Sequence, residues 1–395
     1  MSEKYDVLVV GAGPGGSTAA YAAAENGAKV LVLDKRRELG VPVQCGEALS
    51  EDILNELNIE PDPRWAINRI IGAKLVSPSG NSLILKEKRA VGKVGYILDR
   101  KCFDRHLAIR AARAGADIRV DTFVNGLIEE EGEYKGVTAQ TMDGQKEYRA
   151  DIIIAADGVM SKVARYAGLN TALGPEDIES GAQFKMVNVE FESSELMEFY
   201  FGSEFAPGGY VWVFPRGEDV ANVGIGVLPE RAEKNSIEYL KDFVKENPRL
   251  KDGKIVEINA GGVPVSGPLE KTVKDNIMVV GDAARQVNAL TGGGMDWAMR
   301  AGNIAGEVAA EAINQDDVSE ESLSKYEGRW REKMSKSLER YLKGKDVLLS
   351  LSDDELDDLA VTLQDVDFEG ISLTQMLKVL AKAHPKLLWK LKGLM

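Results

Sequence analysis

The feature that most constrains this chain is a glycine-rich turn between an apolar strand and an alanine-rich helix near its beginning. An apolar run at 6–10 precedes the turn at 11–16, and a helical stretch follows at 17–26. A second apolar run at 29–33 leads directly to Asp34. In such a βαβ unit the glycines let the backbone approach a pyrophosphate, the helix N-terminus favours its charge, and the acidic residue accepts hydrogen bonds from a ribose. The opening of the chain therefore predicts a parallel sheet that binds a dinucleotide.

Two later apolar runs extend this sheet. The runs at 152–156 and 277–280 stop at Asp157-Gly158 and at Gly281-Asp282, as buried parallel strands do where they leave a sheet at its carboxyl edge. A further helix is predicted over 103–114, because Gly115 closes a pattern with one apolar face. We expect one discontinuous sheet with its ligand at the shared edge.

The region 181–226 has a different period. Tyr210, Trp212 and Phe214 alternate with Val211 and Val213, which is typical of an antiparallel strand. The sequence predicts an α/β protein with an inserted α+β domain. Its expected parts are a discontinuous nucleotide-binding domain (1–70, 99–177 and 266–320), an antiparallel substrate domain (71–98 and 178–265) and a C-terminal helical region (321–395).

Composition excludes several classes of function. A net charge of −14 argues against a nucleic-acid surface, and only two cysteines and two histidines argue against a disulfide framework and a zinc site, so we expect no metal. The first strand begins almost at once, and no run approaches the roughly 20 apolar residues that span a bilayer. We expect a cytoplasmic protein whose membrane contact is peripheral.

The motif after the strand at 277–280 distinguishes FAD from NAD. Gly281-Asp282-Ala283-Ala284 and the turn Thr291-Gly292-Gly293-Gly294-Met295 place an acid and bare backbone near one extended ligand. Here the chain resembles the p-hydroxybenzoate-hydroxylase-like flavoproteins, whose FAD domain is Rossmann-like. Arg100 and the segment 157–161 strengthen the resemblance, although Asp157 can also be a simple turn former.

The resemblance implies FAD as the cofactor and a set of residues that hold it. That set is Gly11, Gly13, Pro14, Gly15, Gly16, Asp34, Lys35, Cys45, Gly46, Ala48, Arg100, Val124, Asp157, Gly158, Asp282, Gly292, Gly293, Gly294 and Met295.

Two segments narrow the function. The loop 41–48 lies where such proteins thread past the flavin, so Gly46 would permit close approach, and Cys45 is either a flavin-side thiol or a small packing residue. The nonapeptide at 207–215 matches the PxxYxWxFP signature, and it resembles the geranylgeranyl reductase family. Tyr210, Trp212 and Phe214 are the candidate substrate-binding residues, as a wall for an apolar substrate, or else a core stripe.

This resemblance implies an FAD-dependent reductase that saturates C=C bonds of geranylgeranyl chains in archaeal ether-lipid precursors, the digeranylgeranylglycerophospholipids. Reduction of geranylgeranyl diphosphate or of a chlorophyll-type side chain is the nearer alternative, and Arg216 looks isolated where a diphosphate would need a basic cluster. An FAD-dependent aromatic hydroxylase and a non-enzymatic prenyl-binding escort protein are the others.

An isolated alkene accepts hydride poorly, so we expect protonation with hydride delivery from flavin N5. Tyr210, Trp212 and Cys45 are the candidate catalytic residues: Tyr210, Cys45 or a water donates the proton, and the aromatic wall with Trp212 steadies positive charge. The electron donor is left open among NAD(P)H, a ferredoxin and a deazaflavin.

The last 25 residues predict contact with lipid. Met376, Leu377, Leu380 and Ala383 share one helical face, and Lys378, Lys382 and Lys386 form a basic row on the other. The segment either docks on the body as a lid or lies peripherally on the inner face of the cell membrane.

Overall fold

The computed structural model describes residues 4–86 and 95–364, and its chain divides into two compact units. The first unit contains Met1–Val41, Arg100–Leu173 and Pro264–Glu339, and the second contains Pro42–Asp99, Gly174–Val263 and Arg340–Met395. The sequence placed 42–70 with the nucleotide-binding part and 321–339 with a separate helical region. The structure assigns the former to the second unit and the latter to the first.

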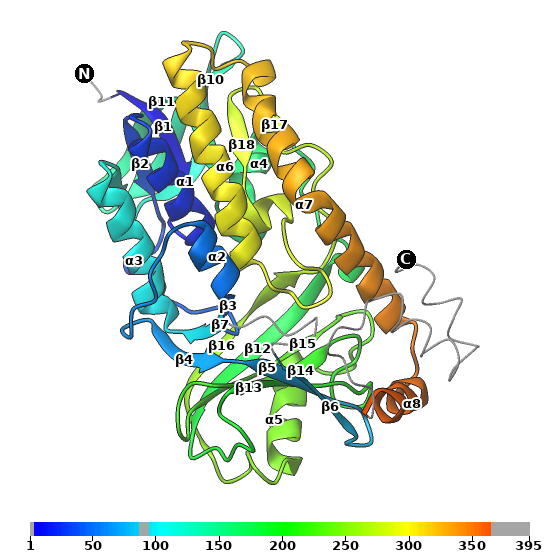
Figure 1. The fold of residues 1–395 in the computed structure, drawn as a ribbon. Helices are drawn as coiled ribbons and strands as arrows, with labels where there is room; N and C mark the ends of the chain where they lie inside the picture. The colour runs from blue at the N-terminus through cyan, green and yellow to red at the C-terminus, as the bar shows by residue number, and fades with distance from the viewer. Residues whose placement is uncertain (1–3, 87–94, 365–395) are drawn as a thin grey trace. The chain divides into compact units, whose positions relative to one another are not determined.

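An eight-stranded sheet forms the centre of the first unit, with the order β17-β18-β11-β1-β2-β8 and with β9 and β10 attached beyond β11 (Figure 1). β18, β11, β1, β2 and β8 run parallel, so the loops after β1, β11 and β18 leave from one edge. The strands are β1 (Lys4–Val10), β2 (Val30–Leu33), β8 (Asp117–Arg119), β9 (Phe123–Glu130), β10 (Glu133–Thr141), β11 (Gly144–Ala155), β17 (Val273–Lys274) and β18 (Ile277–Val279).

Strand β1 is buried on both faces, which explains its continuous apolar sequence. Val7 and Val9 point into one core with the helices, and Leu8 and Val10 point into a second core under β10 and β11. The helices of this unit are α1 (Pro14–Glu25), α3 (Arg100–Arg113), α4 (Lys162–Tyr166), α6 (Met295–Asn314) and most of α7 (Glu320–Leu349).

Helices α1 and α6 pack side by side through glycine (Figure 1). A Cβ atom at Gly302 of α6 would lie 2.2 Å from the carbonyl oxygen of Gly15, and one at Gly306 would lie 2.3 Å from that of Ala19. Gly15 itself lies close to Ala298, near the start of α6. The N-terminal ends of two helices therefore meet at the carboxyl edge of the sheet, where their dipoles favour an anion.

A seven-stranded sheet, β16-β12-β15-β14-β13-β5-β6, forms the centre of the second unit, next to the small sheet β3-β7-β4. The small-sheet strands are β3 (Ala48–Ser50), β4 (Ala66–Ile70) and β7 (Gly95–Leu98). The large-sheet strands are β5 (Gly72–Val76), β6 (Ser82–Lys86), β12 (Ile178–Val187), β13 (Leu196–Tyr200), β14 (Tyr210–Pro215), β15 (Ala221–Val227) and β16 (Lys254–Pro264). The helices are α2 (Glu51–Glu56), α5 (Ser236–Glu246), the end of α7, and α8 (Asp353–Gln364).

Each face of the large sheet carries its own hydrophobic cluster. Helix α5 covers the first face, where Phe184, Val211, Val223 and Ile225 pack together. Because side chains alternate along a strand, the second face receives the intervening residues of β12, β14 and β15. That second face, called the site face below, carries the motif that the sequence singled out.

The predicted fold class is confirmed, with shifts in the element bounds. The helix expected at 103–114 begins at Arg100, and the strand expected at 152–156 begins at Gly144. Among the described residues, no helix is long and apolar enough to cross a membrane. The segment predicted to contact lipid, the last 25 residues with Lys378, Lys382 and Lys386, lies outside the described residues.

Candidate functional site

The glycine-rich turn of the first unit combines two kinds of glycine. Gly11 has a φ of 101°, and a Cβ atom at Gly16 would lie 1.8 Å from the carbonyl oxygen of Gly11, so these two are required by the fold itself. Gly13 differs: its φ is −73°, and among the described residues no atom beyond Gly13 and its two chain neighbours lies within 4 Å of the position of a Cβ atom there. Open space therefore lies beside Gly13 at the start of α1, where a pyrophosphate fits.

Asp34 is buried and ties this turn to the next strand. Its carboxylate accepts hydrogen bonds from the backbone amide of Ala12 at 2.7 Å, from the backbone amide of Arg36 at 2.8 Å, and from two guanidinium nitrogens of Arg36 at 2.7 and 2.9 Å. Burial alone would raise the pKa of Asp34, but the bonds from Arg36 and Ala12 outweigh it and hold the pKa below its ordinary value.

These bonds change the role expected of Asp34. A carboxylate has about four lone-pair positions, and four donors already point at them. A ribose hydroxyl can bind Asp34 in this arrangement only by displacing part of the Arg36 fork. The sequence identified Asp34 and missed Arg36, because a charged residue two positions after a strand carries no signal of its own.

Arg100 belongs to a second part of the same charge network. Its guanidinium donates to both carboxylate oxygens of the fully buried Asp104, at 2.7 and 3.0 Å, and Arg36 lies 4.0 Å from Asp104. Desolvation raises the pKa of Asp282, and the charge of Arg100 opposes that rise. Arg100 therefore lies close enough to both Asp282 and the Asp34–Arg36 pair to affect their electrostatics within the first unit.

The two loops predicted at the sheet edge carry further features of a ligand site. Asp157 accepts a hydrogen bond from the amide of Val163 at 3.1 Å through Oδ2, and within the described part of the chain its buried Oδ1 has no partner. Desolvation raises the pKa of Asp157. Gly292 has a φ of 66°, and a Cβ atom at Gly294 would lie 2.6 Å from Asp282 Oδ1. The absence of a side chain at Gly294 therefore leaves space for the Asp282 carboxylate.

The other residues proposed to hold the cofactor have different placements. Lys35 is exposed and acts electrostatically on Asp157, Pro14 is the first residue of α1, and Met295 begins α6. Val124 is buried in the core beneath β9. Cys45, Gly46 and Ala48 belong to the second unit, so the set predicted from the sequence is divided between the units.

On the site face of the second unit, the three aromatic residues of β14 form one row. The ring centroids of Tyr210 and Trp212 are 6.0 Å apart, and those of Trp212 and Phe214 are 6.3 Å apart. Phe199 of β13 joins them, 5.5 Å from Tyr210 and 5.4 Å from Phe214. These four residues, called the aromatic row below, confirm the predicted common face.

Glycines on β15 make room for this row. Gly224 is the cross-strand partner of Trp212, and a Cβ atom at 224 would lie 2.2 Å from the indole ring. The indole Nε1 donates to Gln183 of β12 at 2.9 Å. Trp212 thus lies over the backbone of β15 with its polar end fixed.

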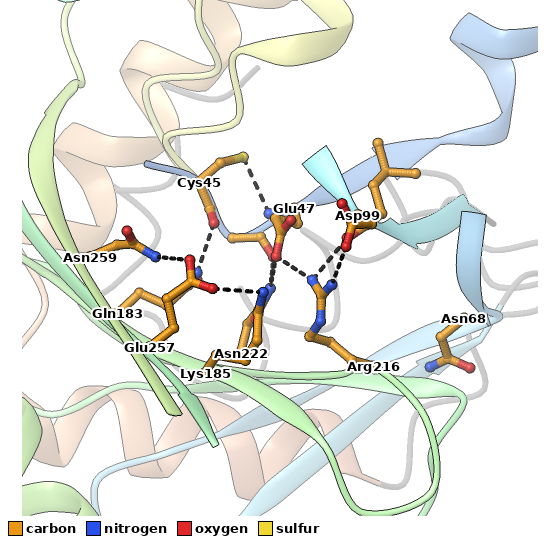
Figure 2. Close-up of polar contacts among 12 residues, drawn as sticks. Cys45, Glu47, Asn68, Asp99, Gln183, Lys185, Arg216, Asn222, Glu257 and Asn259 are labelled. Carbon is orange, nitrogen blue, oxygen red and sulfur yellow. Dashed lines mark hydrogen bonds and ion pairs between the residues drawn. The ribbon is translucent and has the colours of Figure 1, made fainter. Parts of the chain in front are cut away.

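The loop at 45–47 covers the end of the aromatic row. A Cβ atom at Gly46 would lie 2.8 Å from the ring of Phe214, so glycine lets the loop pack closely on this ring. The close approach of Gly46 to the flavin stays a prediction. Gln183 donates to the carbonyl oxygen of Cys45 at 2.9 Å, and Asn222 donates to that of Gly46 at 3.1 Å (Figure 2). The structure therefore brings two segments named from the sequence into contact.

A buried ion pair fixes this loop, and sequence reasoning missed it. Glu47 is 1% exposed, has a φ of 71°, and pairs with Arg216, which also contacts Asp99 and the carbonyl oxygen of Leu98 (Figure 2). Asn222 donates to the same Glu47 carboxylate at 2.7 Å. Arg216 was expected to lack the basic cluster that a diphosphate needs; its charged partners are the acidic Glu47 and Asp99, which lie far away in the chain.

Cys45 and Ala48 flank this pair. Cys45 is half-buried, and its Sγ accepts a hydrogen bond from the amide of Glu47 at 3.2 Å. Ala48 begins β3. The chemical role of Cys45 stays a prediction.

Comparison with known proteins gives consistent matches. The family model described as the geranylgeranyl reductase catalytic domain matches residues 177–263, and that of an NAD(P)-binding Rossmann-like domain matches residues 9–57. A digeranylgeranylglycerophospholipid reductase of Methanococcoides burtonii is 49% identical over 395 residues, with 100% of this chain and 96% of the relative covered.

Solved structures agree in fold. A geranylgeranyl bacteriochlorophyll reductase-like protein of Thermoplasma acidophilum is 41% identical with a TM-score of 0.93, and each chain covers 100% of the other. The myxobacterial chondrochloren halogenase, described as an FAD-dependent halogenase, is 18% identical with a TM-score of 0.70, covering 97% of this chain and 90% of its own. The second likeness concerns the fold alone.

Proposed function

Since the chain belongs to the digeranylgeranylglycerophospholipid reductase family, we propose that it saturates the C=C bonds of geranylgeranyl chains in archaeal ether-lipid precursors, with FAD as its cofactor. The observation that carries the proposal is the aromatic row of Phe199, Tyr210, Trp212 and Phe214 on a sheet face. Rings of this kind suit an apolar chain with isolated double bonds.

The residues of the first unit fit FAD on three structural grounds. Open space lies beside Gly13 at a helix start, the buried Oδ1 of Asp157 has no partner within the described residues, and Arg100 adds positive charge near Asp282. An anionic pyrophosphate with hydroxyl-bearing neighbours provides the charge and the donors that these features lack. Gly13, Arg100, Asp157, Asp282 and the glycines at 292–294 would hold it.

When bound and reduced, FAD supplies the hydride that saturates a C=C bond. The residues of the chain must supply the rest: a proton for the less substituted carbon, and stabilisation of the positive charge that develops on the tertiary carbon. The indole of Trp212 and the other rings can stabilise that charge by cation–π attraction, on the order of 1–2 kcal/mol where water is excluded. Tyr210 and Cys45 each carry a transferable proton near these rings.

The absorption spectrum of the purified protein, followed by mass spectrometry of an archaeal lipid extract incubated with protein and dithionite, tests this function. We expect a flavin spectrum and a gain of two hydrogens per double bond. A gain of oxygen would indicate a hydroxylase, and an unchanged lipid with no flavin would indicate a binding protein; either result contradicts the proposal.

The electron donor and the membrane contact belong to the same proposal. We propose that NAD(P)H, a ferredoxin or a deazaflavin reduces the cofactor transiently, since the NAD(P)-binding match at 9–57 covers the turn already assigned to FAD. We also propose peripheral contact at the inner face of the cell membrane, supported by the basic row Lys378, Lys382 and Lys386 in the sequence.

A further inference from the structure

Glu179 is a buried carboxyl group on the site face, apart from the ion pair that fixes the loop at 45–47. It lies on β12, two positions before Gly181 and four before Gln183, so it shares their side of the sheet. A Cβ atom at Gly226 of β15 would lie 2.2 Å from Glu179 Oε2. The carboxyl group therefore occupies the space that a side chain at 226 would fill.

That position brings Glu179 to the end of the aromatic row. Gly226 is the cross-strand partner of Tyr210, and directly opposed residues have Cβ positions roughly 5 Å apart. Tyr210 is buried among Phe199, Phe201 and Trp212. Desolvation, then the charges of Glu179 and Cys45, raise the pKa of Tyr210 far above its ordinary value. The phenol therefore stays protonated and can pass a proton on only by receiving another.

The surroundings of Glu179 make it a suitable source for that proton. Desolvation raises its pKa to about 7, and the charge of Lys345 on α7 opposes the rise. Lys345 is itself buried and donates to the carbonyl oxygen of Glu176 at 2.9 Å. A carboxylic acid of this strength is a far better proton donor than a phenol, whose ordinary pKa is about 10. Lys345 therefore acts electrostatically on Glu179, and Glu179 and Cys45 act on Tyr210.

We propose that Glu179 supplies the proton for C=C saturation and that this proton travels through the hydroxyl group of Tyr210. The Tyr210 proton bonds to the less substituted alkene carbon, using the π electron pair, while the Glu179 proton moves to the Tyr210 oxygen. FAD, when bound and reduced, would supply the hydride for the tertiary carbon. Glu179 ends as a carboxylate and takes its next proton from water. The inference rests on the proposed function and names the acid for the same site.

The experiment measures single-turnover alkene saturation against pH with protein whose flavin has been reduced by dithionite. Wild-type protein should lose rate above about pH 7, by roughly tenfold per pH unit, because the donor must be protonated. Glu179→Gln cannot release a proton, so its rate should fall on the order of 10²–10⁴-fold. Its pH profile should also lose the decline above about pH 7, called the alkaline limb. Lys345→Met should move that limb to higher pH, since the opposing charge is removed.

Glu176→Gln is the matched control, because Glu176 is exposed and lies three residues away; it should leave the limb unchanged. Flavin content and thermal midpoint report folding. If Glu179→Gln fails to fold, the pH at which the rate of Lys345→Met falls tests the inference in its place. An unchanged alkaline limb in Glu179→Gln or in Lys345→Met, with an active wild type, overturns the inference alone. A wild type that saturates no C=C bond overturns the proposed function and this inference with it.

Discussion

In the first unit the residues proposed to hold the cofactor follow short motifs, whereas in the second unit the site face is assembled from distant segments. Gly11, Gly13 and Gly16 lie within one turn, and Asp34 closes the same βαβ unit. The contact between Glu47 and Arg216 joins residues 169 positions apart, and that between Gln183 and Cys45 joins residues 138 apart. A phosphate site needs backbone amides in sequence, while a surface for an apolar chain needs only side chains that meet.

The glycines of the two units are also required for different reasons. Gly16 lacks a side chain because Gly11 is in the way, and Gly224 lacks one because Trp212 is in the way. Among the glycines of the turn at 11–16, only Gly13 faces open space with an ordinary φ. A side chain at Gly13 should therefore affect a ligand and spare the protein.

The largest effect should come from Gly13→Val. A β-branched side chain in the space beside the start of α1 should abolish flavin binding while the thermal midpoint of the flavin-free protein stays nearly unchanged. The absorbance ratio of flavin to protein measures the first, and thermal unfolding of the stripped protein the second. Gly328→Val is the matched control, since Gly328 also faces open space, in α7. Stoichiometric flavin in Gly13→Val would place the pyrophosphate elsewhere.

The second effect tests whether the site face depends on its buried ion pair. Arg216→Met leaves the Glu47 carboxylate buried without its cation, so the free energy of unfolding should fall by about 3–5 kcal/mol. Urea unfolding measures it. The exposed pair of Arg64 and Asp62 gives the control, and Arg64→Met should cost less than about 1 kcal/mol.

Adding Glu47→Gln to Arg216→Met should restore part of the loss, because the uncompensated charge is then removed. Equal stability of Arg216→Met and Arg64→Met would mean that the pair does not hold the loop.

A third test asks whether lipid recognition extends beyond the site face to the C-terminal segment. Changing Lys378, Lys382 and Lys386 to Glu should weaken flotation with anionic liposomes at low salt, by up to about 1 kcal/mol per lysine removed. A chain ending at Ser372 should float least. Changing the exposed Lys241, Lys245 and Lys251 to Glu alters the net charge equally and is the control. Equal flotation of all forms would leave the segment a packing role only.

The smallest effect should come from Trp212→Ala. Loss of cation–π stabilisation should slow saturation roughly 5- to 30-fold and change the pattern of partly reduced products, while flavin content stays normal. Trp212→Phe keeps an aromatic face and should retain most of the rate. If Trp212→Ala matches the wild type in rate and products, the aromatic row is core packing.

The sequence by itself determined the βαβ unit, the parallel sheet and the common face of Tyr210, Trp212 and Phe214. Each of these depends on local periodicity, 3.6 residues for a helix and two for a strand, and on glycines whose neighbours lie in the same motif.

Tertiary structure alone decided the partners of charged residues. That Arg36 fills the lone pairs of Asp34, that Arg216 is paired with Glu47, and that Glu179 lies over Gly226 beside Tyr210 all depend on strand order and register. A register shift of one residue would send Glu179 and the aromatic row to opposite faces. Charge pairing and burial are therefore properties of the assembled sheet, because the distance between two side chains in space is not contained in their spacing along the chain.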